Sequence, residues 1–144
     1  MSAAPGPGPG LGPGPGPGPG TGERWARAAL SRLAEPGDKQ VHRLVTSVGA
    51  LETVQRLHEG AGTLSRFAAR VAALDTARDL EIAAKVGARL VVPGDDEWPQ
   101  RLSDIALPPW CLWVRGPLHL ASTVERSVAV VGSRSATSYG EQVA

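Results

Sequence analysis

Residues 128–139, VAVVGSRSATSY, combine a short apolar run with a turn whose residue types suit a phosphate group. The apolar residues at 128–131 predict a strand that is covered on both faces in a parallel sheet. Gly132 lets a ligand approach the backbone closely, and Arg134 carries a planar guanidinium that can bind two phosphate oxygens. The pattern predicts an anion-binding loop after the strand.

A helix is expected to follow this loop. Ser138 and Glu141 have the spacing of a capping box, so the helix should begin near Tyr139 and direct its free amides toward the loop. No further glycine follows in the loop until Gly140, so the dinucleotide fingerprint is missing and tight dinucleotide binding is disfavoured. An ion-paired or solvated surface position for Arg134 is the alternative interpretation.

Composition limits the classes of protein that this chain can belong to. Residues 1–22 form a tail rich in proline and glycine, which we expect to be disordered because it has little apolar surface to bury. The formal net charge of +1 excludes a global basic field. The only cysteine, Cys111, excludes an internal disulfide and a cysteine metal cluster. Without a secretory pattern or a run of membrane-spanning length, we expect a cytoplasmic protein with no membrane span.

Residues 23–86 repeat apolar side chains at intervals of three and four, which predicts a compact helical module. The positions expected to cap or end its helices are Pro36-Gly37, Asp38, Gly49, Gly60 and Thr63, and the helical pattern is expected to continue or restart near Asp75. Thr63 is expected to cap a longer helix. The link around Gly49 is similar to a helix-hairpin-helix turn that offers amides to a DNA phosphate, but an ordinary helix connection is favoured because basic residues do not flank it.

Residues 87–144 change to an alternation of strands and helices, with strands expected at 90–92 and 111–114. The carboxylates at 95–97 suggest a metal site, but a solvated acidic loop is favoured because no histidine is near. Packing is favoured over base stacking for the tryptophans of this region, which are Trp98, Trp110 and Trp113.

The histidines of the chain are widely spaced in the sequence, and no chemistry is assigned to them. They are His42, His58 and His119.

Several of these residues recur together in a known family, the DprA/Smf DNA-processing proteins, which the chain resembles. The matching residues are Pro93-Gly94-Asp95, Trp98-Pro99, Leu102, Pro108-Pro109, Leu112 to Gly116, Val131 to Arg134 and Tyr139-Gly140. The preceding helices are also similar to the small N-terminal module of that family. The resemblance therefore covers almost everything after the tail.

The resemblance implies an α/β fold in which a small helical, SAM-like module precedes a Rossmann-like parallel sheet. It implies a protein that is not an enzyme and needs no cofactor or metal, but binds and protects single-stranded DNA during natural transformation and recombination. The implied partners are single-stranded DNA and a RecA-type recombinase, and a homodimer of the intact protein is a further candidate. Its phosphate-binding residues would be Gly132, Ser133, Arg134 and Ser135.

The family pattern continues beyond Ala144, so we interpret the chain as a truncated N-terminal fragment with impaired function. The expected units are the tail, 1–22, the helical module, 23–86, and the incomplete start of the Rossmann-like domain, 87–144. Because a parallel strand without neighbours leaves backbone groups unsatisfied, we expect the last unit to be poorly ordered in isolation.

Two other classes of protein remain open. Phosphoribohydrolases of the lysine-decarboxylase-like type also carry a strand, a Gly-Ser turn and a nearby tyrosine, and they bind nucleoside monophosphates. They usually lack an upstream module such as the one here, which favours DNA binding. A purely structural module, with Arg134 in an ion pair, is the third interpretation. No catalytic acid/base pair or activated nucleophile can be assembled from the residues present.

Overall fold

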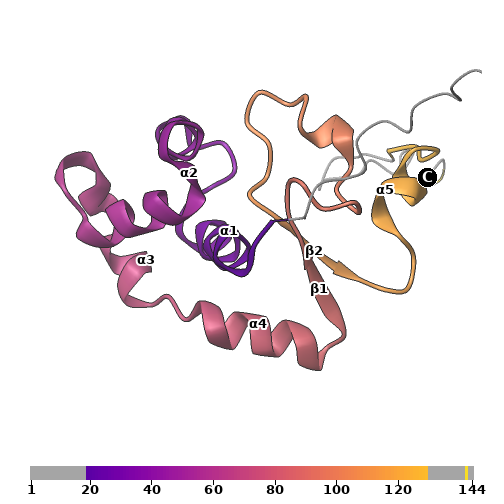
Figure 1. Ribbon diagram of the computed structural model, residues 1–144, viewed down its shortest axis with the longest axis horizontal. Helices are drawn as coiled ribbons and strands as arrows, with labels where there is room; N and C mark the ends of the chain where they lie inside the picture. The colour runs from indigo at the N-terminus through magenta and orange to yellow at the C-terminus, as the bar shows by residue number, and fades with distance from the viewer. Residues whose placement is uncertain (1–18, 130–141, 143–144) are drawn as a thin grey trace, which may run out of the picture.

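A computed structural model describes residues 19–129 and residue 142 of the chain. Helices α1 to α4 come first, a two-stranded sheet follows, and the short α5 comes last (Figure 1). In chain order, with η for a 3-10 helix, the elements are α1 (Thr21–Leu33), α2 (Lys39–Glu59), η1 (Gly62–Phe67), α3 (Ala68–Ala72), α4 (Thr76–Lys85), β1 (Ala88–Val91), η2 (Gln100–Leu102), β2 (Leu112–Arg115) and α5 (Leu120–Val124).

The boundary between α1 and α2 lies where the sequence predicts it. Pro36 disfavours helical geometry for the residue before it, and α1 ends at Leu33. One carboxylate oxygen of Asp38 then accepts hydrogen bonds from the backbone N–H groups of Gln40, at 3.0 Å, and Val41, at 3.1 Å. Because these amides have no partner inside the helix, this cap fixes the start of α2.

Gly49 divides α2 into two helical halves. Its φ of 84° and ψ of 168° are not helical, and a positive φ is a region that residues with a Cβ rarely adopt. The predicted stop at this glycine is therefore confirmed, and the left-handed Gly60 ends the second half as expected. Although α2 has 21 residues, neither it nor any other described helix is long and apolar enough to cross a membrane.

Substituting Gly49 tests this backbone requirement. In Gly49→Ala the new Cβ would meet no atom within 4 Å, so any cost must come from the positive φ and not from a clash. We expect the free energy of unfolding to fall by about 1 kcal/mol or more in chemical denaturation. Gly37→Ala, which also has open space but no positive φ, is the matched control and should change stability by much less. Equal losses of unfolding free energy in Gly49→Ala and Gly37→Ala would contradict the expected backbone strain at position 49.

The segment after Gly60 differs from the prediction. A longer helix capped by Thr63 was expected, but residues 62–72 form the 3-10 helix η1 and only five residues of α3. The hydroxyl of Thr63 accepts a hydrogen bond from the side-chain amide of Gln40 at 2.6 Å, and η1 has no side-chain cap. A helix restarts near Asp75 as expected, and the structure adds a cap, since the carboxylate of Asp75 accepts from the backbone N–H of Arg78 at 3.0 Å.

The described sheet is an antiparallel pair in which Ala88 lies opposite Arg115 and Val91 lies opposite Leu112. Both predicted strands exist, with small shifts of their ends, and the general α/β class is confirmed. The parallel Rossmann-like sheet stays a prediction, because its strand at 128–131 extends past the described residues. The truncation and the division of the chain into three units also stay predictions.

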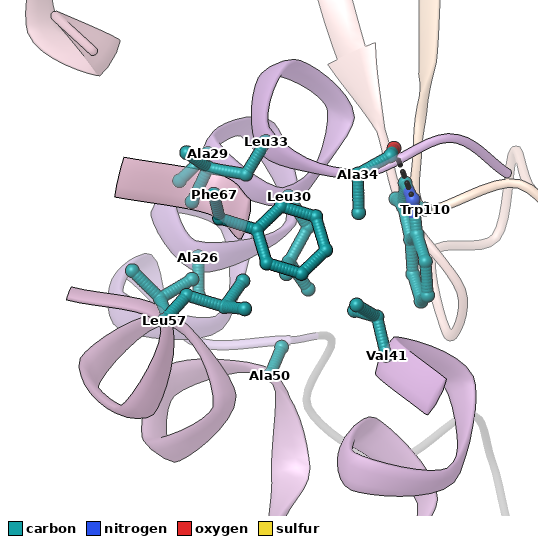
Figure 2. Close-up of a cluster of buried hydrophobic side chains, with 11 residues drawn as sticks. Ala26, Ala29, Leu30, Leu33, Ala34, Val41, Ala50, Leu57, Phe67 and Trp110 are labelled. Carbon is teal, nitrogen blue, oxygen red and sulfur yellow. Dashed lines mark hydrogen bonds between the residues drawn. The ribbon is translucent and has the colours of Figure 1, made fainter. Parts of the chain in front are cut away.

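The main core joins the helices to the connection between β1 and β2 (Figure 2). The indole of Trp110 is 2% exposed, and its Nε1–H donates a hydrogen bond to the carbonyl oxygen of Ala34 at 3.0 Å. Its partners in this cluster are Ala26, Ala29, Leu30, Leu33, Ala34, Val41, Ala50, Val54, Leu57 and Phe67. A second cluster joins Ala28 of α1 to Leu90, Val92 and the buried Cys111, whose thiol pKa is raised by burial.

Truncating the core should have a large effect on stability. Leu30 is fully buried, whereas Leu51 is 46% exposed. We expect Leu30→Ala to lower the free energy of unfolding by about 2–5 kcal/mol, because buried contacts are lost and a cavity remains. The control Leu51→Ala should lower it by about 1 kcal/mol or less. Both values can be measured by urea denaturation, and a small loss for Leu30→Ala would contradict the central place of this residue.

Candidate nucleic-acid interface

The loop predicted to bind phosphate lies outside the residues that the structure describes. This applies to all its members, Gly132, Ser133, Arg134 and Ser135. The residues described just before it, 127–129, are in no helix or strand, and Val128 is 87% exposed. The roles predicted for the loop therefore stay predictions. The described residues form a different candidate site.

A groove of about 690 Å³ lies between the first half of α2 and the connection from β1 to β2. In Figure 1 this connection is the long orange loop beside α2. The groove is lined by Arg27, Lys39, His42, Arg43, Val45, Thr46, Ser47, Pro93, Trp98, Ser103, Ala106, Leu107, Pro108 and Trp110. We call it the α2 groove. Its lining combines basic side chains with an apolar wall.

Two tryptophans give the groove a rigid base. Trp98 and Trp110 are 1% and 2% exposed, and each indole N–H is occupied. The Nε1–H of Trp98 donates to the hydroxyl of Ser103 at 3.1 Å, and that of Trp110 donates to the backbone of Ala34. The prediction that these two residues pack and do not stack on bases is confirmed, because their rings are inaccessible. Trp113, by contrast, is 40% exposed on β2.

His42 connects α2 to this base. Its ring stacks on the indole of Trp110, with centroids 4.0 Å apart and planes inclined by 25°. Its Nε2 lies 2.6 Å from the carbonyl oxygen of Pro36, and since a carbonyl can only accept, Nε2 carries the proton. The sequence assigned no chemistry to this histidine. The structure gives it a positioning role, since it holds the start of α2 against the tryptophan.

The positive charge of the α2 groove comes mainly from α2. Lys39 and Arg43 are one helical turn apart, so they lie on the same face of the helix. Neither has a carboxylate oxygen within 4.0 Å in the described part of the chain, whereas Arg27 is paired with Glu23 at 2.8 Å. No aspartate or glutamate belongs to the described lining. Two cations are therefore left without a neutralising partner in a groove.

An ion pair fastens the connection between β1 and β2, which forms the apolar wall of the groove, to α1. One guanidinium nitrogen of Arg24 lies 2.6 and 2.8 Å from the two carboxylate oxygens of Asp95. The other donates to the carbonyl oxygen of Leu90, and the Asp95 carboxylate also accepts from the backbone N–H of Val92 at 2.9 Å. The turn after β1 is thus held from both sides, which keeps the wall near α2.

A second ion pair joins Arg89 of β1 to Glu97. The Nε–H of Arg89 donates to one carboxylate oxygen of Glu97 at 2.8 Å, and Nη2 of the same guanidinium donates to the other carboxylate oxygen. The same carboxylate accepts from the backbone N–H of Leu120 at 2.9 Å, while Arg89 also donates to the carbonyl of Leu118 at 2.7 Å. The hydrogen bonds from Arg89 and Leu120 lower the pKa of Glu97 to about 2.

These contacts correct one prediction. A solvated acidic loop was expected at 95–97, but Asp95 and Glu97 are both ion-paired, and their side chains are only 14% exposed. Asp96 is 86% exposed, as predicted, although Nε2 of His119 lies 3.7 Å from its carboxylate, so a histidine is near. The sequence could not reveal this pairing because the partner of Asp95, Arg24, lies 71 residues away. Among the residues described, no cluster of His, Cys, Asp and Glu could hold a metal ion.

The residues of the α2 groove were missed by the sequence reasoning. The sequence analysis assigns no ligand role to Lys39 or Arg43. The one available signal was the spacing of four between these two basic residues, which places them on one helix face. That signal is weak alone, because a solvated helix surface commonly shows the same pattern.

The ion pair of Glu97 should make stability depend on acid pH. Because its pKa falls from 4.5 to about 2 on folding, the stabilisation is present above pH 4.5 and is lost as pH falls toward 2. We expect the free energy of unfolding to decrease more steeply below about pH 5 in the unsubstituted chain than in Glu97→Gln. Glu81→Gln, at an exposed position of α4, is the control and should keep the steep decrease. Identical pH profiles for Glu97→Gln and the unsubstituted chain would contradict this.

Comparison with known proteins gives two findings. Residues 89–144 match the family profile described as DNA recombination-mediator protein A. Over 133 aligned residues the chain is 38% identical to proteins from two Mycobacterium tuberculosis strains, CDC 1551 / Oshkosh and ATCC 25618 / H37Rv, each described as a candidate DNA processing protein DprA. The alignment covers 83% of this chain and 34% of each relative, so the chain spans about a third of their length. No solved structure matches the chain significantly.

The two matches overlap but differ in extent. The family profile begins in β1, at Arg89, and contains Glu97 and the predicted phosphate loop. The alignment with the mycobacterial relatives covers more of this chain and therefore extends beyond the region of the profile.

Proposed function

Because the chain belongs to the DprA family of DNA-processing proteins, we propose that it acts in DNA processing by binding single-stranded DNA without catalysing a reaction. The observation that carries this proposal is the 38% identity to relatives described as candidate DNA processing proteins. The chain spans about a third of those relatives, so strand binding is proposed here for its own residues.

The proposed phosphate contacts come from the loop that follows residues 128–131. The guanidinium of Arg134 would bind two oxygens of one phosphate, and the hydroxyls of Ser133 and Ser135 would donate to the same group. Gly132 would let the strand approach the backbone. Hydrogen bonds to phosphate position a strand without reading its bases, so affinity should depend little on sequence.

The described residues support this proposal by anchoring the chain that leads to the loop. Glu97 accepts from the backbone N–H of Leu120, and Arg89 donates to the carbonyl of Leu118. The carbonyl of Gly116 accepts from the same arginine at 2.5 Å. The segment Gly116–Leu120, which precedes the predicted loop in the sequence, is thereby held against β1 and the turn that follows it.

The wider roles follow from the family resemblance. The proposed setting is the cytoplasm during natural transformation and recombination, where the protein would protect incoming strands and load a RecA-type recombinase. A homodimer of the longer protein is a further proposal.

The hydrolase alternative receives no support from the relatives, which are described as DNA-processing proteins. We propose a binding protein because the sequence offers no nucleophile beside a base. Incubation with nucleoside monophosphates tests this proposal, and release of the free base would contradict it.

Substituting Arg134 tests the proposed contact. We expect Arg134→Ala to weaken binding of oligothymidylate about tenfold or more, because a hydrogen bond to a charged group contributes about 1.5–3 kcal/mol. Fluorescence anisotropy with a labelled oligonucleotide measures the affinity. The affinities for oligothymidylate and for a mixed-sequence strand should fall by similar factors.

Arg78→Ala is the matched control for charge, since Arg78 is exposed on α4 and forms no ion pair within the described residues. This control should bind as the unsubstituted chain does. Unchanged affinity of Arg134→Ala would show that the phosphate site has been assigned to the wrong loop.

A further inference from the structure

We propose that the α2 groove is a second contact site for single-stranded nucleic acid, in which Lys39 and Arg43 hold phosphates and the opposite wall packs against sugars and bases. This site is separate from the predicted loop, because its lining comes from residues 27–110 and the loop begins at Gly132. The inference rests on the proposed function, since it assumes that the ligand is nucleic acid.

The charge of the groove favours a polyanion. Lys39 and Arg43 are exposed, and neither makes a salt bridge or a side-chain hydrogen bond within the described residues. Their four-residue spacing corresponds to about 6 Å along the helix axis, so both can reach the same short stretch of a strand. Cations that are not needed for folding remain available for an anionic ligand.

The carboxylates near the groove do not cancel this charge. Asp95 is turned toward Arg24 at 2.6 Å, and Asp38 is 2.7 Å from Arg66 while it caps α2. Glu23 is paired with Arg27. Each of these three carboxylates is thus paired with an arginine, and no carboxylate belongs to the described lining that Lys39 and Arg43 share.

Two of the three hydroxyls in the described lining of the groove are engaged as donors, while that of Ser103 accepts from the indole N–H of Trp98. The Thr46 hydroxyl donates to the carbonyl of His42 at 2.9 Å, and the Ser47 hydroxyl donates to the carbonyl of Leu44 at 3.0 Å. They are therefore not free to donate to a ligand in this arrangement. The proposal consequently assigns phosphate binding to the two cations and not to the hydroxyls.

The opposite wall distinguishes single strands from duplexes. Its apolar members are Pro93, Ala106, Leu107 and Pro108, which face the basic side of the groove. An unpaired strand exposes base faces that can pack on apolar side chains, whereas a duplex hides them inside its stack and presents its charged backbone. A groove with one basic and one apolar side therefore fits a single strand better.

The groove is held in shape before any ligand binds. His42 stacks on the buried Trp110, and Arg24 fastens Asp95 of the loop to α1. A preformed site loses little conformational entropy on binding, which favours affinity.

The test compares two double substitutions in the full chain. Lys39→Gln/Arg43→Gln removes the groove cations, while Arg78→Gln/Lys85→Gln removes one arginine and one lysine from exposed positions of α4. Binding of fluorescein-labelled oligothymidylate is followed by anisotropy over a range of salt concentrations. Thermal unfolding of both variants confirms that they fold, since none of the four side chains belongs to either core cluster.

We expect the groove variant to bind about tenfold more weakly and its slope of log K against log salt to fall in magnitude by about 1.4, since each phosphate contact on a single strand contributes about 0.7. The α4 variant should keep the affinity and the slope of the unsubstituted chain. Equal losses in the two variants would overturn the site, because the effect would then be one of net charge alone.

Two further outcomes separate this inference from the proposed function. If Arg134→Ala weakens binding and the groove variant does not, the α2 groove is not a contact site, although the proposed function stands. If the unsubstituted chain does not bind oligothymidylate, both proposals fail. A duplex that competes as well as the single strand would overturn the assignment of the apolar wall to bases. Additive losses when Arg134→Ala is combined with the groove variant would support two independent sites.

Discussion

The burial of one indole, that of Trp110, connects the helical and the strand-forming parts of this chain. It is 2% exposed within the main core, and its N–H is paired with Ala34, a residue 76 positions earlier. Fully burying a tryptophan removes about 150–250 Å² of surface from water, so this contact is among the largest in a small fold. Both sides of the α2 groove depend on it, because it places the β1–β2 connection against α1 and α2.

Two ion pairs further fix the position of the segment that contains Asp95 and Glu97. Arg24 and Arg89 draw the carboxylates of Asp95 and Glu97 toward the inside of the loop, where they also accept backbone hydrogen bonds. The negative charges of Asp95 and Glu97 are thereby used within the fold, and the basic residues of α2 remain available at the surface. A chain with a net charge of only +1 can in this way present a locally basic groove.

Local signals predicted the helical part well. Asp38 and Gly49 lie where the structure caps or interrupts a helix, because capping and positive φ depend on residues within a few positions. Prediction was wrong for the long helix after Thr63, whose hydroxyl is engaged by Gln40 from another helix. It was also wrong for the solvated loop at 95–97, in which Asp95 pairs with the distant Arg24 and Glu97 pairs with Arg89 of β1.

The sequence by itself determined the cap at Asp38, the two strands and the family resemblance, since these depend on residue type and short spacing. Only the tertiary structure decided the antiparallel pairing of β1 with β2 and the pairing of Asp95 with Arg24. It alone also brought the α2 cations opposite the wall at 106–108. Such contacts join residues far apart in the chain, and their distances are set by how the core packs.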